Sequence, residues 1–114
     1  MDTINSIKAL QSAQSPDILE KLLEIYLGNA PGLIEELESS IRDESCESIR
    51  NSAHGLKSAS GSIGARKIFE LSAKLENMAR DGNIEDASMI LDEIKQLFPM
   101  TCKLLEQEVQ RPAA

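Results

Sequence analysis

The sequence predicts an all-α fold, an antiparallel four-helix bundle with one additional short helix at the N-terminus. One observation is that the apolar residues are almost all aliphatic, with two Phe, one Tyr and no Trp among 114 residues. Aliphatic cores are typical of packed helices, whereas strands are enriched in β-branched and aromatic residues. The other observation is that apolar residues recur at three- and four-residue spacing in four segments joined by brief polar connections. We therefore expect almost no sheet.

Length and charge narrow the class of protein further. A chain of 114 residues fits one domain spanning residues 1–114. With 19 acidic and 12 basic residues its net charge is −7, which disfavours nucleic acid or an anionic membrane as partner and favours other proteins. No stretch approaches the roughly 20 apolar residues of a membrane span, and the start MDTINSIKAL does not resemble a signal peptide. We expect a cytoplasmic location.

The first half of the chain predicts the short helix and one long helical segment. A weak amphipathic pattern at Ile4, Ile7 and Leu10 predicts the short leading helix. The sequence Ser-Pro-Asp at 15–17 is typical of a helix start, since it supplies a cap, a first-turn proline and an acidic residue at the positive end of the dipole. The long segment then runs from Ile18 to Ile41. Pro31 interrupts it within 28–32, and local rules allow either a kink or a break there.

The second half predicts three further helices. Ile49, Ala53, Leu56, Ser60 and Ile63 share one face of the next helix, which should end at Gly64. A helix with apolar residues at Ile68, Leu71, Leu75 and Met78 follows, and Asp81-Gly82-Asn83 predicts the tight turn after it. The last predicted helix runs from Ile84 to Val109, and we expect a kink at Pro99.

His54, the single histidine of the chain, lies in the helix predicted over 47–63. On a helical wheel, the apolar positions of that helix and Ser60 fall within an arc of roughly 80°. His54 lies about 135° from the centre of this arc, so its ring should face solvent rather than the core. The side chains expected around it on the surface are basic, polar or small. They are Arg50, Asn51, Lys57, Ser58 and Gly61.

This neighbourhood suits a site that accepts a phosphoryl group. A neutral imidazole is a competent nucleophile near pH 7, and a phosphorylated ring could pair with Lys57 and with Arg50 as a second cation. Gly61 lacks a side chain and should leave open space for a partner's loop. An exposed histidine near a lysine is, however, also found on ordinary solvated helix faces. Taken alone, the local pattern leaves both interpretations open.

A longer string around His54 resembles the signature of the histidine-containing phosphotransfer (HPt) domain family, commonly written HxLKGxSxxxGA. Residues 53–65 read AHGLKSASGSIGA. The matching residues stand at the family's spacing: His54, Leu56, Lys57, Ser60, Gly64 and Ala65. Ser58 departs from the pattern, because the family usually has glycine there. Its hydroxymethyl group either narrows the partner's approach or adds a hydrogen bond.

The resemblance continues on both sides of this string. Residues 26–37, YLGNAPGLIEEL, are similar to the family's aromatic-Leu-x-x-x-Pro helix, which implies that Pro31 sits within a helix. Residues 68–76, IFELSAKLE, are similar to the helix that follows the histidine in the family. The likeness thus covers nearly the whole chain.

The resemblance implies a phosphorelay carrier with defined roles for its residues. His54 would accept a phosphoryl group on its far ring nitrogen from the aspartyl phosphate of one response-regulator receiver domain and pass it to another. Lys57 would stabilise the phosphoryl charge. Arg50, Asn51, Ser58 and Gly61 would form the face that docks on the partner. The receiver would supply Mg²⁺, so this chain would need no metal or other cofactor of its own.

Such a carrier would have no ATP site, in agreement with the absence of a P-loop or a kinase glycine-rich loop from the sequence. The resemblance leaves its context open. The chain could act alone, as a monomer, or belong to a hybrid sensor histidine kinase.

Two other classes of function remain to be compared with this one. The first is a helical adaptor or inhibitor that docks on a kinase or receiver through the same face without phosphoryl chemistry, and the presence of His54 argues against it. The second is a hydrolytic or metal-dependent enzyme, which would need a nucleophile with its base or a ligand cluster. Cys46 and Cys102 match neither a metal-ligand nor a redox spacing. We interpret them as small packing or surface residues.

Overall fold

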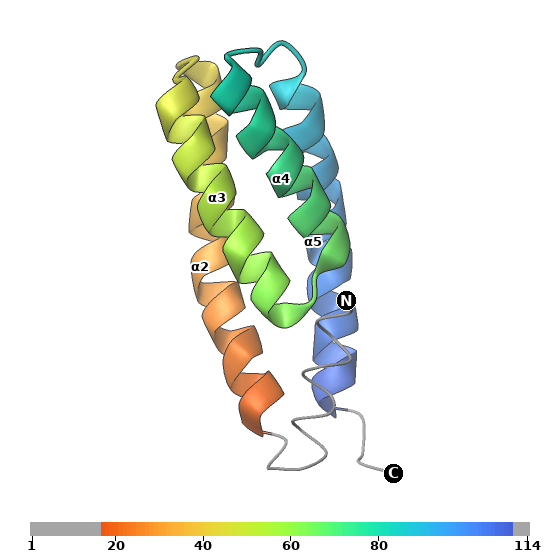
Figure 1. Ribbon diagram of the computed structural model, residues 1–114. Helices are drawn as coiled ribbons and strands as arrows, with labels where there is room; N and C mark the ends of the chain where they lie inside the picture. The colour runs from red at the N-terminus through yellow and green to blue at the C-terminus, as the bar shows by residue number, and fades with distance from the viewer. Residues whose placement is uncertain (1–16, 111–114) are drawn as a thin grey trace.

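The computed structural model describes residues 17–110, which form four α-helices and contain no strand (Figure 1). Helix α2 spans Asp17–Arg42, α3 spans Cys46–Ile63, α4 spans Arg66–Asp81 and α5 spans Ala87–Gln110. The predicted all-α class is confirmed. The short helix expected around residues 4–10 lies outside the described part of the chain.

Consecutive helices run antiparallel and close into a bundle. Helix α3 packs against α2 and α4, and α5 packs against the same two helices, so that within residues 17–110 each helix has two neighbours. Figure 1 shows α2 and α5 extending past the short turn between α3 and α4. The α3–α4 pair therefore forms one face of the upper part of the bundle, and the candidate site lies on this face.

Three of the helices end in the same type of turn. At each end a residue with positive φ follows the helix, and two backbone N–H groups return to carbonyls of the last turn. This residue is Glu44 after α2 (φ 53°), Gly64 after α3 (φ 80°) and Gly82 after α4 (φ 76°). Glycine takes this conformation without steric cost, and Gly64 and Gly82 end their helices where the sequence predicts. Glu44 takes it despite its Cβ atom.

Pro31 lies inside α2, which is continuous across it. The neighbouring core positions Ala30 and Ile34 are buried, whereas Pro31 is exposed. Because the proline faces outward, water can reach the backbone carbonyl that loses its intrahelical partner. The placement of Pro31 within a helix, which the family resemblance implies, is therefore confirmed.

The last helix begins three residues later than the sequence predicts, at Ala87 instead of Ile84. Ile84 lies in the connection after Gly82, where its side chain is half-buried against the core. An apolar residue in a loop that packs on the core thus extended the helical pattern by one turn. Pro99 lies within α5 and is exposed, like the proline of α2.

The core contains the five predicted positions of α3, which are all buried: Ile49, Ala53, Leu56, Ser60 and Ile63. Tyr26 of α2 joins them to two other helices. Its hydroxyl shares a buried hydrogen bond of 2.9 Å with Ser60 Oγ, and its ring lies 5.7 Å from that of Phe98 of α5 at an angle of 50°. Burial raises the pKa of the Tyr26 phenol to about 12. These contacts fix the orientation of α3, whose opposite face carries His54.

Candidate functional site

His54 lies on the outer face of α3 with 61% of its side chain exposed, as the helical wheel predicts. Behind it, Gly55 packs closely on α2, because a Cβ atom at Gly55 would lie 3.1 Å from Cδ2 of Leu33. The glycine next to the histidine therefore lets α2 support this part of α3. The imidazole itself stands free of the core.

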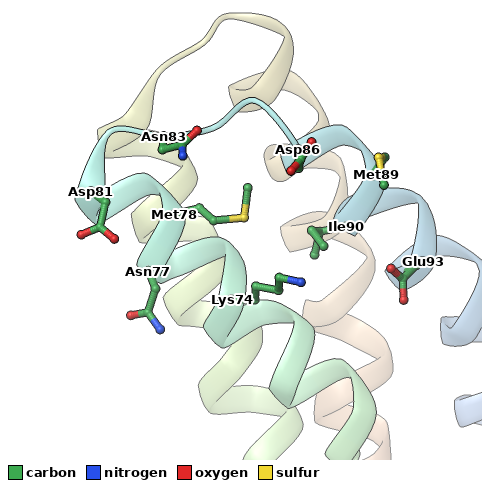
Figure 2. Close-up of a pocket in the computed structure, with 9 residues that line it drawn as sticks. All are labelled: Lys74, Asn77, Met78, Asp81, Asn83, Asp86, Met89, Ile90 and Glu93. Atoms are coloured by element: carbon green, nitrogen blue, oxygen red, sulfur yellow. The ribbon is translucent and has the colours of Figure 1, made fainter.

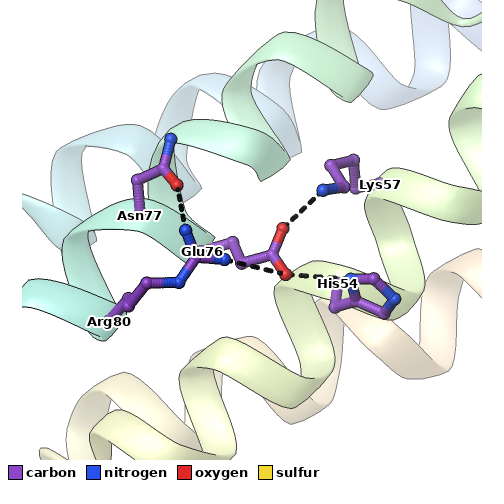
Figure 3. Close-up of polar contacts among 5 residues, drawn as sticks. All are labelled: His54, Lys57, Glu76, Asn77 and Arg80. Carbon is purple, nitrogen blue, oxygen red and sulfur yellow. Dashed lines mark hydrogen bonds and ion pairs between the residues drawn. The ribbon is translucent and has the colours of Figure 1, made fainter.

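Glu76 of α4 binds both His54 and Lys57 (Figure 3). His54 Nδ1 lies 2.8 Å from Oε2 of Glu76, and Lys57 Nζ lies 2.7 Å from Oε1. Only 8% of the Glu76 side chain is exposed, so this carboxylate is almost removed from water. Glu76 thus links His54 and Lys57, the two residues of α3 that the sequence predicts for the site.

The electrostatics of Glu76 determine which nitrogen of His54 can react. The hydrogen bond from Lys57 and a weaker one from His54 lower the pKa of Glu76, although burial opposes the shift. The carboxyl group is therefore ionised at neutral pH and can only accept hydrogen bonds. Nδ1 must then carry the hydrogen, and a neutral ring keeps its lone pair on Nε2. In Figure 3 the second ring nitrogen of His54 points away from Glu76.

Arg80 adds a second cation on the far side of Glu76. Its Nη2 lies 3.8 Å from Oε2 of Glu76, beyond hydrogen-bond length, and Nη1 donates a hydrogen bond of 3.1 Å to Oδ1 of Asn77. The Arg80 side chain is 58% exposed. One buried carboxylate is thus surrounded by an imidazole, an ammonium and a guanidinium.

Sequence reasoning missed Glu76 and Arg80. The sequence did contain a signal for Glu76. It stands four residues after Ser72 and three before Ala79, and both of these lie on the side of α4 that faces the core. A charged side chain at the edge of a buried helix face indicates an ionic partner on the neighbouring helix. Which residue of α3 provides that partner depends on how the two helices pack.

The other predicted site residues lie on the same helix as His54, but one prediction about them is wrong. Arg50, Asn51 and Ser58 are exposed, as expected. Gly61 does not leave open space, because a Cβ atom there would lie 3.1 Å from Cδ2 and 3.2 Å from Cε2 of Phe69 of α4. The missing side chain therefore accommodates an aromatic ring of the same chain. Phe69 is itself 38% exposed, so it adds an apolar surface to this face.

A hollow of about 390 Å³ lies between α4 and α5 (Figure 2). Its charged lining consists of Lys74, Asp81, Asp86 and Glu93. Neither His54 nor Glu76 lines it. Within residues 17–110, no three His, Cys, Asp or Glu side chains are arranged to hold a metal ion. None of the helices described is long and apolar enough to cross a membrane.

Comparisons with known proteins give one consistent family. A sequence model of the Hpt domain matches residues 21–111. The histidine-containing phosphotransfer protein 1 of Arabidopsis thaliana is 21% identical over 102 residues, covering 88% of this chain and 66% of that protein.

Two solved structures share the fold of this chain. The histidine-containing phosphotransfer protein B (HptB) of Pseudomonas aeruginosa PAO1 has a TM-score of 0.77 at 21% identity, covering 97% of this chain and 93% of that chain. The histidine-containing phosphotransfer domain of ArcB from Escherichia coli has a TM-score of 0.82 at 20% identity, covering 93% of this chain and 90% of that chain. With the Hpt domain model matching residues 21–111, this chain belongs to the Hpt domain family, the histidine-containing phosphotransfer domains.

Proposed function

We propose that this chain serves a phosphorelay by carrying a phosphoryl group on Nε2 of His54. The observation that carries the proposal is the 2.8 Å contact between His54 Nδ1 and the nearly buried Glu76 carboxylate, on a ring that is 61% exposed. This contact holds the hydrogen on Nδ1 and directs the lone pair of Nε2 outward. An outward lone pair is what attack on a phosphoryl group held by a partner requires.

The transfer balances without any movement of a proton. A bond forms between His54 Nε2 and phosphorus while the bond between phosphorus and the receiver's aspartyl oxygen breaks, and the aspartate leaves as a carboxylate. Nδ1 keeps its hydrogen, so the phosphorylated ring becomes cationic. Glu76 accepts the Nδ1–H hydrogen bond at 2.8 Å and stabilises that charge. The reverse reaction on a second receiver uses the same contacts.

Lys57 and the exposed face around His54 take the remaining roles. Lys57 Nζ binds the same carboxylate as His54 Nδ1, so its ammonium lies beside the ring and can donate to the phosphoryl oxygens. Such a charge-assisted hydrogen bond contributes about 1.5–3 kcal/mol. Arg50, Asn51 and Ser58 form the docking face together with Phe69, which joins them because Gly61 lies beneath its ring.

The partners follow from what the site does not itself supply. In-line transfer needs cations that neutralise the negative charge of the equatorial phosphoryl oxygens. We propose that the receiver domain provides most of this positive charge, with Mg²⁺ in its own acidic pocket. The chain then acts as a carrier, without a nucleotide site and as a monomer, between receivers or between a hybrid sensor histidine kinase and a receiver.

The proposal is tested by incubating the chain with a receiver domain phosphorylated on its aspartate with labelled acetyl phosphate. We expect an acid-labile, base-stable label on the chain that is absent from His54→Gln. Ser62→Ala serves as the control, because Ser62 is exposed on the same helix and its hydroxyl donates to the backbone carbonyl of Ser58. If His54→Gln accepts as much label as the unaltered chain, the proposal is wrong. Binding to the receiver without labelling would favour an adaptor.

A further inference from the structure

We infer that Glu76 exchanges cationic partners during the phosphorylation cycle: Lys57 leaves it for the phosphoryl group on His54, and Arg80 takes the place of Lys57 at the carboxylate. Arg80 would thus be a positioning residue, acting through Glu76 and not on the phosphoryl group itself. The inference rests on the proposed function and adds a residue that the family signature does not contain. In the unphosphorylated chain Glu76 makes unequal contacts with its two cationic neighbours, Lys57 and Arg80.

In this state Lys57 is the close partner and Arg80 is held nearby. Lys57 Nζ lies 2.7 Å from Oε1, whereas Arg80 Nη2 lies 3.8 Å from Oε2 and makes no hydrogen bond to it. The hydrogen bond from Lys57, the weaker hydrogen bond from His54 and the charge of Lys57 lower the pKa of Glu76. Arg80 is not among the causes of that shift. The guanidinium is therefore within ion-pair distance of the carboxylate but is not hydrogen-bonded to it.

Phosphorylation would draw Lys57 away from Glu76. The new group on the ring carries about two negative charges, more than the single charge of the carboxylate that Lys57 now binds. Within residues 17–110, Lys57 is the one recorded partner of Oε1. A carboxylate that is only 8% exposed cannot lose that partner without a large desolvation penalty. The departure of Lys57 is therefore favourable only if another donor reaches Oε1.

Arg80 has the position and the shape to be that donor. It lies one helical turn after Glu76 on α4 and so shares its face. Its planar guanidinium can bind both oxygens of a carboxylate at once. Asn77 Oδ1 accepts from Nη1 at 3.1 Å and keeps the guanidinium beside the carboxylate, while the side chain is 58% exposed, so Nη2 has room to close its 3.8 Å separation from Oε2.

The charges also balance under this exchange. Before transfer, Lys57 and Arg80 together oppose the single negative charge of Glu76, which leaves one positive charge in excess. After transfer, the cationic ring adds one positive charge and the phosphoryl group about two negative charges, so the site is close to neutral. The site can therefore accept the dianionic phosphoryl group without excess charge, provided that both Lys57 and Arg80 remain in it.

The experiment compares Arg80→Gln and Arg80→Lys with a matched control, Arg66→Gln. Arg66 lies on the same helix and makes a similar pair, 3.7 Å from its Nε to Oε1 of Glu70, but it is far more exposed. Each variant is equilibrated with the same phosphorylated receiver domain, and the fraction of chain phosphorylated on His54 is measured. Nitrogen NMR spectra of the arginine side chains are recorded at neutral pH with and without phosphorylation. Urea unfolding of the unphosphorylated variants checks their folding.

We expect Arg80→Gln to lower the equilibrium constant for phosphorylation by up to about fivefold, the ratio that one exposed ion pair provides. Arg80→Lys should restore part of it, and Arg66→Gln should match the unaltered chain. The side-chain resonances of Arg80, and not those of Arg66, should shift on phosphorylation. The inference is overturned if the chain is phosphorylated on His54 while Arg80→Gln behaves like Arg66→Gln and the Arg80 resonances stay in place. Failure of the unaltered chain to accept a phosphoryl group would instead overturn the proposed function, and this inference with it.

Discussion

The environments of two largely buried residues, Glu76 and Tyr26, shift their pKa values in opposite directions. Glu76 is ionised, because hydrogen bonds from Lys57 and His54 lower its pKa although burial opposes the shift. Tyr26 is kept neutral, because burial raises the pKa of its phenol and the hydrogen bond to Ser60 only partly offsets that effect. Glu76 directs the ring of His54, and Tyr26 fixes the inner face of the same helix.

Tyr26 offers a direct test at the residue scale, because it is the single tyrosine of the chain. We expect tyrosinate absorbance of the folded protein to rise with a midpoint of about 12, compared with 10.0 for an unperturbed phenol. Since the folded pKa is the higher one, the stability that this group contributes is complete below pH 10.0 and is lost as the pH rises toward about 12. The urea-unfolded chain is the control. A midpoint near the unperturbed value, with helicity still intact, would contradict the structure.

The sequence predicted the candidate phosphoryl-accepting residue and its lysine better than the side chains of α4 that contact them. His54 and Lys57 lie on one helix, so periodicity and the family signature were sufficient to find them. Glu76 and Arg80 belong to the next helix, and their contact with His54 depends on the packing register of α3 against α4. Local spacing cannot give that register. The same limit explains the error at Gly61, whose free space is taken by Phe69 from α4.

At the scale of helices, their C-terminal ends give a matched comparison. The connections after α2, α3 and α4 share one hydrogen-bond pattern, but the residue in the left-handed conformation is a glutamate in the first and a glycine in the other two. A residue with a Cβ atom is strained in this conformation by about 1–2 kcal/mol. The end of α2 therefore holds strain that the end of α4 lacks.

We predict opposite effects of two substitutions at these ends. Glu44→Gly should raise the free energy of unfolding by about 1 kcal/mol, because it removes the strain at φ 53°. Gly82→Ala should lower it by about 1 kcal/mol through conformation alone, since a Cβ atom there meets nothing within 4 Å. Urea unfolding at neutral pH measures both. A destabilising Glu44→Gly would show that the conformation of this turn does not limit stability.

Helix boundaries were predictable where chemistry marks them and less so elsewhere. Gly64 and Gly82 end their helices as expected, because glycine at this position has a specific conformational reason. The effect of Pro31 was not decided by local rules, which do not state whether a proline faces water or the core. The start of α5 was misplaced because Ile84 packs on the core from a loop. Burial, not helicity, produced that part of the pattern.

At the scale of the whole molecule, the bundle separates support from reaction. Tyr26 of α2 hydrogen-bonds Ser60 on the buried side of α3 and packs on Phe98 of α5, while α4 supplies the carboxylate that binds His54. The ring of His54 thus projects from a helix that packs on α2 and α4, instead of from a loop. This arrangement suits a group that two different partners must reach in turn, and it leaves Nε2 of the imidazole as the atom open to them.

The most direct test is to identify the phosphorylated atom. The chain, labelled with nitrogen-15 in histidine, is phosphorylated by a receiver domain, and nitrogen–phosphorus coupling is measured by NMR at neutral to alkaline pH. Because Glu76 occupies Nδ1 of His54, we predict a single phosphoryl group bound to Nε2 of this residue. Phosphorus on Nδ1, or on any residue other than His54, would contradict the account.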